Sequence, residues 1–479
     1  MRSMNRRSVL KAGLAAGVSL AVPFSRAYGA NDRVRIGVIG LGVRGGEDAK
    51  AFTSVSGAEI AAITDPDNER VGDFLKKYPQ ATPYADLRRM LEDKSIDAVV
   101  VTTCNHWHCL ASIWAMQAGK DVYVEKPLSH SQWEGAQVVK AARKYDKIVQ
   151  LGTQQRSDPM QAEIKKYLHE DKALGQIEFI EVVRYGVRQS IGKRKTPLEI
   201  PKEINYDLWL GPAQDLPLFR EKFHYDWHWD WNTGSGEMGN WGVHVLDDAR
   251  NNGLLDKPRM PKRVMAGGGR LGWDDAGETP NVHFVYYDTG SIPVLLGLSN
   301  LPAAPGDKKS LNFRGATSGY VIHCEGGYFS GQRGKGAAFD KDGKKIREFK
   351  GNSGAGHQQN FVDALRKRDR SILNAEIELG NDSSGWCNLA NIAYRAGGDF
   401  TREKAESMRK DYQPWNDLLD QMQEHVHNYG VALDSKSVKL SSVLELDEKG
   451  EKFVGEGAAE GNKYLKREYR KGYEVPEIG

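Results

Sequence analysis

The chain has 479 residues and a formal net charge of +3, and 39% of its residues are apolar and 27% are charged. This length is more than one ordinary domain needs, so two domains are expected. The composition excludes a low-complexity or disordered chain. Four cysteines are too few for a disulfide scaffold and lack the spacing of metal ligands, so no metal site is predicted from them.

Residues 1–30 have the features of a targeting segment. The pair Arg6-Arg7 precedes a mildly apolar stretch, residues 12–23, and a small-residue site at residues 25–27. The stretch is too short to span a bilayer comfortably, and paired arginines are typical of twin-arginine export, which moves folded proteins. The alternative is a basic start without such a role. The sequence therefore predicts a periplasmic protein that meets the twin-arginine export machinery.

Loss of this segment changes the charge balance of the protein. It holds five positive residues and no acidic one, so its removal takes the formal net charge from +3 to −2. A nearly neutral mature protein without a basic patch is not expected to bind nucleic acid.

A glycine motif, G-x-G-x-x-G, follows a predicted strand at residues 34–39. Its glycines are Gly40, Gly42 and Gly45, and Val43 and Arg44 stand between the last two. In dinucleotide-binding domains these glycines allow a tight turn, the approach of the pyrophosphate, and close packing of helix on strand. The next helix then offers free N–H groups and its positive dipole end to the phosphates. The alternative is a glycine turn in a domain that binds no nucleotide.

An acidic residue stands where the ribose of a dinucleotide is expected. The second predicted strand, residues 58–64, ends at Asp65, which is twenty residues after Gly45. A carboxylate there suits the ribose hydroxyls and repels a 2′-phosphate. The sequence therefore favours NAD over NADP as the cofactor.

Residues 31–152 alternate short apolar runs with helical segments such as residues 67–77 and 108–118. This alternation predicts an α/β fold: a Rossmann domain that binds NAD, with a doubly wound parallel sheet and helices on both faces. Its strands are expected at residues 34–39, 58–64, 98–102, 121–124 and 148–151.

Residues 153–404 predict a second α/β domain, with a large, open, mostly antiparallel sheet that covers the cofactor and binds substrate. Its strands are expected at residues 177–185, 263–266, 282–287, 292–298 and 320–324, and helices at residues 358–368 and 383–397. Residues 405–479 are charged and are predicted to form a helical strap over the surface, with a late helix at residues 462–470.

Lys126 lies where chemistry is expected in such a fold. Ligands bind at the carboxyl ends of the strands, and Glu125, Lys126 and Pro127 directly follow the strand at residues 121–124. A partly desolvated lysine near the positive nicotinamide has a lowered pKa and exchanges a proton near neutral pH. On the residues alone, a surface lysine is an equal alternative.

Residues 223–255 hold four of the eleven tryptophans, together with several polar side chains. Flat apolar rings beside a few fixed polar groups are what a sugar site needs. The alternative is a set of core tryptophans, although three alternating ones separated by His and Asp do not resemble a core strand. A helix is expected to begin near Asn240 and to carry Asn240 and His244 on one face. The candidates are Tyr225, Trp227, His228, Trp229, Trp231, Asn240, Trp241, His244 and Asp248.

A metal is the rival explanation for the histidines of this stretch. His224 and His228 have a four-residue spacing, but no H-E-x-x-H or cysteine-rich pattern accompanies them. Zinc is therefore not predicted.

The paired-arginine segment, the glycine loop, the Glu-Lys-Pro tripeptide and the G-x-x-G-x-H-x-x-D motif at residues 239–247 together resemble one family. It is the Gfo/Idh/MocA family of glucose–fructose oxidoreductase, inositol dehydrogenase and rhizopine catabolism proteins. The resemblance runs from residue 33 to about 395, including WLGP at residues 209–212 and GHQQNF at residues 356–361. It implies hydride transfer between a sugar or cyclitol carbon and nicotinamide, and a homodimer or homotetramer formed through the second sheet.

The resemblance also implies roles for single residues. Lys126 and His244 match the family's active-site lysine and histidine. One departure matters: the family often has aspartate where this chain has Asn240, and a neutral amide cannot accept a proton or tune His244 as a carboxylate does. We therefore expect Lys126 to carry the proton. Cofactor contacts are implied for Thr103, Asn105, His108, Glu125 and Lys126.

Three functions fit these observations. The first is an NAD-dependent carbohydrate oxidoreductase, in which a hydroxyl gives its proton to Lys126, aided by His244, and the tryptophans hold the sugar. The second is redox-neutral glycoside cleavage, by C3 oxidation, C1–C2 elimination, water addition and re-reduction, or a partial step that makes or cleaves a 3-keto glycoside. It needs a second base, for which Tyr225 or His228 are candidates. The third is a sugar-binding protein that keeps NAD as a structural part. Free NAD is scarce outside the cytoplasm, so tight retention of the cofactor is expected.

Overall fold

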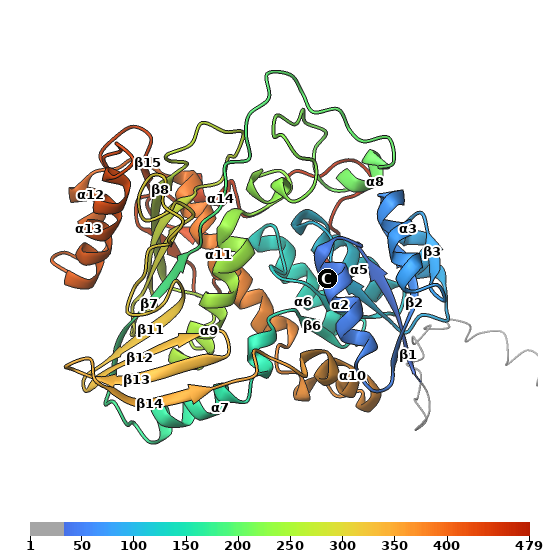
Figure 1. Cartoon of the computed structure of the whole chain (residues 1–479), viewed down its shortest axis with the longest axis horizontal. Helices are drawn as coiled ribbons and strands as arrows, with labels where there is room; N and C mark the ends of the chain where they lie inside the picture. Colours follow the sequence, from blue (N-terminus) through green and yellow to red (C-terminus); the bar gives the residue numbers. More distant parts are fainter. Residues whose placement is uncertain (1–32) are drawn as a thin grey trace, which may run out of the picture.

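The computed structural model describes residues 33–479, so the predicted export segment, residues 1–30, lies outside the described residues. The first domain is built on a six-stranded sheet in the order β3-β2-β1-β4-β5-β6, and every neighbouring pair is parallel (Figure 1). This is the predicted doubly wound sheet. The strands are β1 (Val34–Ile39), β2 (Ala58–Thr64), β3 (Thr82–Tyr84), β4 (Ala98–Val101), β5 (Asp121–Val124) and β6 (Val149–Leu151).

Only β3 of these strands was not predicted. It is a three-residue edge strand with Pro83 at its centre, and proline is tolerated in sheets mainly at such edges. Its sequence therefore carries no strand pattern.

Helices cover both faces of this sheet. On one face lie α2 (Val43–Thr53) and α3 (Asn68–Lys77), and on the other lie α4 (Leu87–Glu92), α5 (His108–Gln117) and α6 (Gln132–Lys144). The first face also receives α10 (His357–Lys367), from the range 153–404 that the sequence assigned to the second domain. Phe361 of α10 packs edge-to-face on Phe52 and Tyr123, with ring centroids 6.1 and 5.8 Å apart. The first domain's core is therefore completed by a later segment.

The second domain is built on a mixed sheet in which only the β7–β10 pair is parallel. The prediction of a mostly antiparallel sheet is confirmed. Its main path is β14-β13-β12-β11-β7-β10-β9-β8-β16-β15. The strands are β7 (Ile177–Tyr185), β8 (Arg263–Gly269), β9 (Val282–Asp288), β10 (Val294–Ser299), β11 (Ser318–Cys324), β12 (Gly327–Gln332), β13 (Lys335–Asp340), β14 (Lys345–Lys350), β15 (Gly398–Asp399), β16 (Lys439–Leu440), β17 (Leu444–Leu446) and β18 (Phe453–Val454).

Each face of the second sheet is covered by different helices. The inner face packs on α7 (Met160–Lys165), α9 (Val243–Gly253) and α11 (Ile377–Ala396). The outer face of β7 to β10 packs on α13 (Gln413–His427), whose Trp415 is fully buried. Part of the sheet face that the family resemblance assigned to subunit pairing is therefore covered by this chain itself.

The late helix predicted at residues 462–470 is wrong. The chain instead has α14 (Ala458–Asn462), and residues 463–479 run without helix across the first domain. Tyr473, Val475 and Ile478 enter the hydrophobic core formed by α5 and α6, and the side chain of Arg467 donates to the carbonyls of Pro212 and Asn232. These tertiary contacts set the extended conformation, because local helix propensity is only a weak preference.

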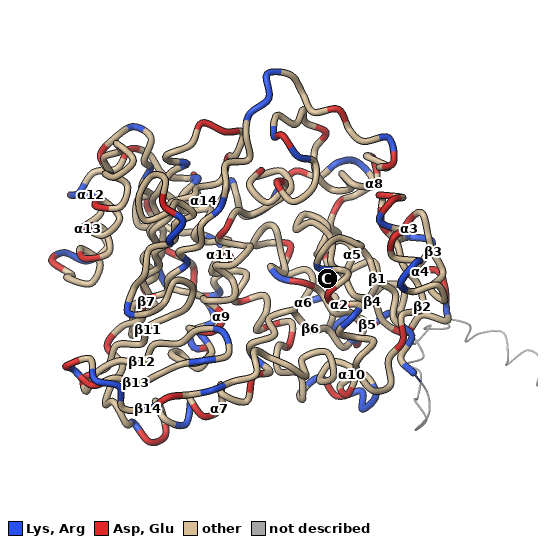
Figure 2. Tube along the Cα trace, in the orientation of Figure 1, with Lys and Arg blue, Asp and Glu red and all other residues tan. Residues whose placement is uncertain are grey.

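Short elements complete the fold: α8 (Tyr206–Leu210) and α12 (Arg402–Glu406), and the turns η1 (Asn105–Trp107), η2 (Gln154–Ser157), η3 (Lys166–Glu170), η4 (Asp226–Trp229), η5 (Met238–Gly242) and η6 (Arg370–Ile372). Figure 2 shows acidic and basic residues interspersed over both domains. No helix in residues 33–479 is both long and apolar enough to cross a membrane.

We expect Phe361→Ala to lower the free energy of unfolding by about 3–5 kcal/mol, because it leaves a cavity where α10 meets the first sheet. Phe361→Leu keeps most of the volume and costs less. Urea unfolding followed by circular dichroism measures both. Ile346→Ala is the control, since Ile346 is 53% exposed and its loss changes stability by less than about 0.5 kcal/mol. A Phe361→Ala variant as stable as this control would contradict the packing described.

Candidate active site

The glycine loop forms a cradle for phosphate at the end of β1. Gly40 has φ of +94°, a conformation that side chains rarely adopt, and a Cβ at Gly45 would collide with the Gly40 carbonyl. Gly42 caps α2 without any side-chain hydrogen bond, and the first turn of α2 has no acidic residue. Val43 in that turn is 81% exposed. The free N–H groups and the helix dipole therefore fit the pyrophosphate of a dinucleotide.

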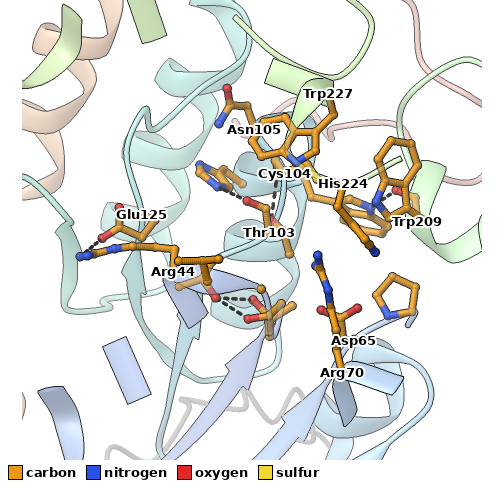
Figure 3. Close-up of a pocket in the computed structure, with 18 of the residues that line it drawn as sticks. Arg44, Asp65, Arg70, Thr103, Cys104, Asn105, Glu125, Trp209, His224 and Trp227 are labelled. Atoms are coloured by element: carbon orange, nitrogen blue, oxygen red, sulfur yellow. Dashed lines mark hydrogen bonds and ion pairs between the residues drawn. The ribbon is translucent and has the colours of Figure 1, made fainter. Parts of the chain in front are cut away.

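Asp65 lies at the ribose end of this cradle. Its carboxylate accepts hydrogen bonds from the backbone N–H groups of Leu41 (2.6 Å) and Asp67 (2.9 Å), so it ties the end of β2 to the glycine loop. Burial raises the pKa of Asp65. Arg70 lies beside it in Figure 3, with its guanidinium next to Gly42 and its Nε 3.5 Å from Asp67. Arg70 was not among the residues expected at this site, although its place in the first turn of the helix after Asp65 could have indicated it.

The cradle opens into a cavity of about 470 Å³ at the carboxyl ends of the first domain's strands. Ligands of doubly wound sheets bind at this edge. Most of the residues expected to bind the cofactor line it: Gly40, Gly42, Val43, Arg44, Asp65, Thr103, Asn105, His108, Glu125 and Lys126. Gly45 lies beneath the loop, where its lack of a side chain lets α2 approach β1.

Residues 203–233, which we call the roof, cover this cavity. In Figure 3, Trp209, His224 and Trp227 of the roof lie across the cavity from Asp65 and Arg70. Trp209 and His224 were not predicted to line the site, because they belong to a largely irregular segment whose position depends on tertiary contacts. Backbone and side-chain bonds fasten the roof to the first domain: Asn68 N–H to Glu203 O (3.1 Å), Asn205 N–H to Pro66 O (2.8 Å), Trp107 Nε1–H to Trp209 O (3.0 Å), and His224 Nε2 to Asp67 Oδ2 (3.0 Å).

Arg44 turns away from the loop toward two buried carboxylates. Its Nη2 lies 2.8 Å from Glu125 Oε1 and 2.9 Å from Asp48 Oδ1. Burial opposes charge on Glu125, yet the charges of Arg44 and Lys126 outweigh it and lower the pKa of Glu125. Glu125 therefore supports the cradle through Arg44 and holds the loop after β5 by accepting the Lys126 N–H at 3.2 Å.

Lys126 projects into the cavity from the end of β5. Its Nζ donates to the backbone carbonyl of Asn240 at 2.7 Å and lies 3.4 Å from the Asn240 side-chain Oδ1. Burial lowers the pKa of Lys126, against the opposing charge of Glu125. The amine is thus hydrogen-bonded, desolvated and placed between the two domains, as a proton-transfer group must be.

The predicted helix near Asn240 begins with a π-helical turn, η5, and continues as α9. Asn240 and Trp241 line the cavity, whereas His244 does not. The His244 ring lies half-buried against Trp241, with centroids 5.6 Å apart, and burial lowers its pKa well below the usual histidine value. His244 is therefore a neutral ring that packs beside Trp241 and lies close enough to Lys126 to interact with its charge.

Tyr225 and His228 line the cavity near Lys126. Tyr225 is 47% exposed, and its hydroxyl accepts a hydrogen bond from Arg188 at 3.0 Å. The His228 Nδ1–H donates to the Tyr225 carbonyl at 2.6 Å, which leaves Nε2 as an acceptor. Burial lowers the pKa of His228 to about 3. His228 stacks on Trp227 at 3.6 Å, so the two rings form one wall.

Three residues expected to bind substrate lie outside this cavity. Trp229 is buried, and its carbonyl accepts the N–H of Glu278 at 2.8 Å. Trp231 packs near Tyr394 and lines a separate small cavity. Asp248 is buried beside Asp247, and burial raises its pKa well above the usual aspartate value. Of the four tryptophans, only Trp227 and Trp241 face the cavity. Within residues 33–479, no group of three or more His, Cys, Asp or Glu side chains is arranged to hold a metal ion.

Comparison with known proteins identifies the family of both domains. Residues 34–153 match the family described as "Oxidoreductase family, NAD-binding Rossmann fold", and residues 188–429 match "Oxidoreductase family, C-terminal alpha/beta domain", both of the Gfo/Idh/MocA group. Two solved structures have the same fold. They are the oxidoreductase yvaA from Bacillus subtilis (TM-score 0.56, 19% identity, 76% of this chain and 96% of that one) and the WlbA dehydrogenase from Bordetella pertussis in complex with NADH and UDP-GlcNAcA (TM-score 0.56, 18% identity, 76% and 96%).

Curated relatives match in shorter segments. Inositol 2-dehydrogenase 2 of Saccharopolyspora erythraea is 34% identical over 137 residues, which are 28% of this chain and 40% of that protein. Inositol 2-dehydrogenase of Salmonella typhimurium is 27% identical over 178 residues, which are 36% of this chain and 52% of that protein. The chain thus spans about half the length of these relatives. The two family matches together cover both domains, and the protein is therefore a member of the Gfo/Idh/MocA oxidoreductase family with an NAD-binding Rossmann domain.

Proposed function

We propose that this protein is an exported NAD-dependent oxidoreductase that moves a hydride between a carbohydrate hydroxyl carbon and a tightly held nicotinamide. The observation that carries the proposal is the half-buried, hydrogen-bonded amine of Lys126, which shares one cavity with the glycine loop and Asp65. The inositol 2-dehydrogenases among its relatives support a sugar or cyclitol as substrate. Bound NAD supplies the hydride acceptor.

Lys126 accepts the proton of the substrate hydroxyl in this proposal. Its lowered pKa raises the fraction of neutral amine near neutral pH, and the Asn240 carbonyl orients that amine. Trp227 and Trp241 offer apolar faces to the sugar ring, and the Tyr225 hydroxyl offers a hydrogen bond. His244, which packs on Trp241 and interacts with the charge of Lys126, aids this proton transfer.

Lys126→Met is expected to lower kcat for sugar oxidation by about 10²–10⁴-fold, because general base catalysis contributes that much. In the parent protein the rate rises with pH as Lys126 loses its proton, with a midpoint below the ordinary lysine pKa. Stopped-flow absorbance of reduced nicotinamide measures both. Lys120→Met is the matched control, since burial lowers the pKa of Lys120 as well, but its amine bonds the carbonyls of Asp93 and Ile96 at the opposite end of β5. Full turnover by Lys126→Met would remove Lys126 from proton transfer.

A second candidate function is redox-neutral cleavage of glycosides, in which hydride returns after C1–C2 elimination. His228 favours it, because a neutral imidazole with a free Nε2 lies near Lys126 and supplies the second base that C2 deprotonation needs. Tyr225 is the alternative base. A protein that performs only half of this route makes or cleaves 3-keto glycosides.

One assay separates these activities. Incubation with glycosides in D₂O, followed by nicotinamide absorbance and mass spectrometry, gives stoichiometric reduced cofactor for the simple dehydrogenase. Cleavage without net reduction, with deuterium at C2 of the product, identifies the elimination route. We expect His228→Ala to abolish cleavage and to keep hydride transfer. Sugar binding with neither reaction would identify a sugar-binding protein that keeps NAD as a structural part.

We further propose that residues 1–30 direct the folded holoprotein to the periplasm through the twin-arginine route. The roof supports the proposal of tight retention, since it covers the cavity and is bonded to residues 66–68 and to Trp107. Protein from the periplasmic fraction should therefore keep about one NAD per chain through dialysis, as measured by ultraviolet spectroscopy and mass spectrometry. The variant R6K/R7K should stay in the cytoplasm. Recovery of protein without NAD would contradict retention.

A homodimer or homotetramer is part of the same proposal. The outer face of β11 to β14, beyond the reach of α13, carries half-buried rings such as His323 and Tyr328 that can pair with a second copy. Light scattering of the purified protein tests this assembly, and a monomer at micromolar concentration would contradict it.

A further inference from the structure

A buried carboxylate lies one turn before Asn240, the position where the family often has aspartate. Glu237 is fully buried, and its Oε2 accepts a hydrogen bond from the Asn240 side-chain Nδ2 at 3.2 Å. Asn240 in turn lies 3.4 Å from Lys126 Nζ through its Oδ1. A continuous chain therefore links Glu237, Asn240 and Lys126.

The carboxylate of Glu237 has strong partners on its other side. Oε1 lies 2.6 Å from Arg184 Nη2 and 3.1 Å from Arg188 Nη2, and Oε2 accepts from Arg188 Nε at 3.1 Å. These two arginines hold the carboxylate group in one orientation. Arg184 is itself fixed over the Trp241 ring, with its guanidinium 4.7 Å from the centroid. Glu237 is thus rigidly placed beside the wall of the cavity.

This arrangement fixes which way the Asn240 amide faces. A carboxylate only accepts hydrogen bonds, so the NH₂ group of Asn240 must turn toward Glu237. The amide oxygen then turns toward the ammonium of Lys126, which only donates. Glu237 therefore determines which end of the Asn240 side-chain amide carries the oxygen. The backbone carbonyl oxygen and the side-chain Oδ1 of Asn240 both face Lys126.

We propose that Glu237 is a positioning residue that acts on Lys126 through Asn240, so that this chain keeps the carboxylate of the family's aspartate position one helical turn earlier. The inference rests on the proposed role of Lys126 in proton transfer. Glu237 supplies the negative charge and orients the Asn240 amide, and Asn240 in turn orients the Lys126 amine.

Several charged groups act on Lys126, and Glu237 is one of two that favour its protonated form. Glu125 is the other, while Arg44 and Arg188 oppose protonation. The neighbouring imidazoles are neutral, because burial lowers the pKa of each. Loss of the Glu237 charge must therefore lower the pKa of Lys126. The groups that face Lys126 are Glu125, Arg44, Glu237, Arg188, His108, His228 and His244.

The test measures Lys126 directly as well as through turnover. An amine reacts with acetic anhydride only when it is unprotonated, so the pH dependence of Lys126 acetylation, read by mass spectrometry on the full-length protein, gives its midpoint without any substrate. The pH profile of kcat/KM for sugar oxidation gives the midpoint of the same amine during catalysis. We compare the parent with Glu237→Gln, Asn240→Asp and the double variant E237Q/N240D.

Glu237→Gln should lower the acetylation midpoint by about one pH unit and shift the rising limb of kcat/KM to lower pH by the same amount. Asn240→Asp should raise both, because it puts a carboxylate next to the amine. E237Q/N240D should return both to within about half a pH unit of the parent, since it moves one carboxylate by a single turn. Asp288→Asn is the control: Asp288 also accepts from an arginine, Arg263 Nε at 2.8 Å, but lies in β9 away from the cavity.

An unchanged or raised midpoint in Glu237→Gln, or a double variant that fails to restore the parent value, would overturn the inference. If Glu237→Gln does not fold, Glu237→Asp carries the test. It keeps the charge beside the arginines but is one methylene too short to reach Asn240, so kcat should fall while KM stays, and an unchanged kcat would overturn the inference. Midpoints that shift as stated in a protein without sugar oxidation refute the proposed function and leave the role of Glu237 standing.

Discussion

The removal of one lysine amine from water is the constraint around which the site is organised. A desolvated ammonium is costly unless its hydrogen bonds are replaced, and Lys126 finds them in the oxygens of Asn240, which belongs to the other domain. The two domains must therefore be correctly docked before this amine is satisfied. Within the second domain, the buried guanidinium of Arg156 in η2 pairs with the buried Asp247 of α9 and holds η2 against that helix.

The charged groups on each side of the cavity are balanced separately. On the first domain, Arg44 and Glu125 pair beneath the glycine loop, and on the second, Arg184 and Arg188 share Glu237. Each cluster stays within its own domain and ends next to Lys126. This arrangement lets the local charge set the behaviour of the amine while the phosphate cradle and the sugar-facing wall keep their own geometry.

Much of the first domain could be predicted from the sequence, because its signals are local. The bounds of β1, β2 and β5 follow from short apolar runs, and the glycine motif at residues 40–45 predicts the turn that the structure shows. Lys126 and Asn240 were found because their positions follow from strand ends and from a motif. The predictions that failed concern segments whose conformation depends on distant contacts. The tail after α14 is extended because it packs on α5 and α6, and the buried Trp229 lies in an irregular segment that is bonded to the distant Glu278 and Thr279. Glu237 was missed for the same reason, since only its two arginine partners from β7 and the loop after it reveal its place.

The path of residues 473–478 has a consequence for the order of events during synthesis. Tyr473, Val475 and Ile478 pack in the core formed by α5 and α6. The ribosome synthesises both helices long before it adds these three residues. The hydrophobic core of the nucleotide-binding domain is therefore incomplete until nearly all of the other described residues have been translated. A chain that ends before Tyr473 would therefore lack three side chains from the core of the domain that was made first.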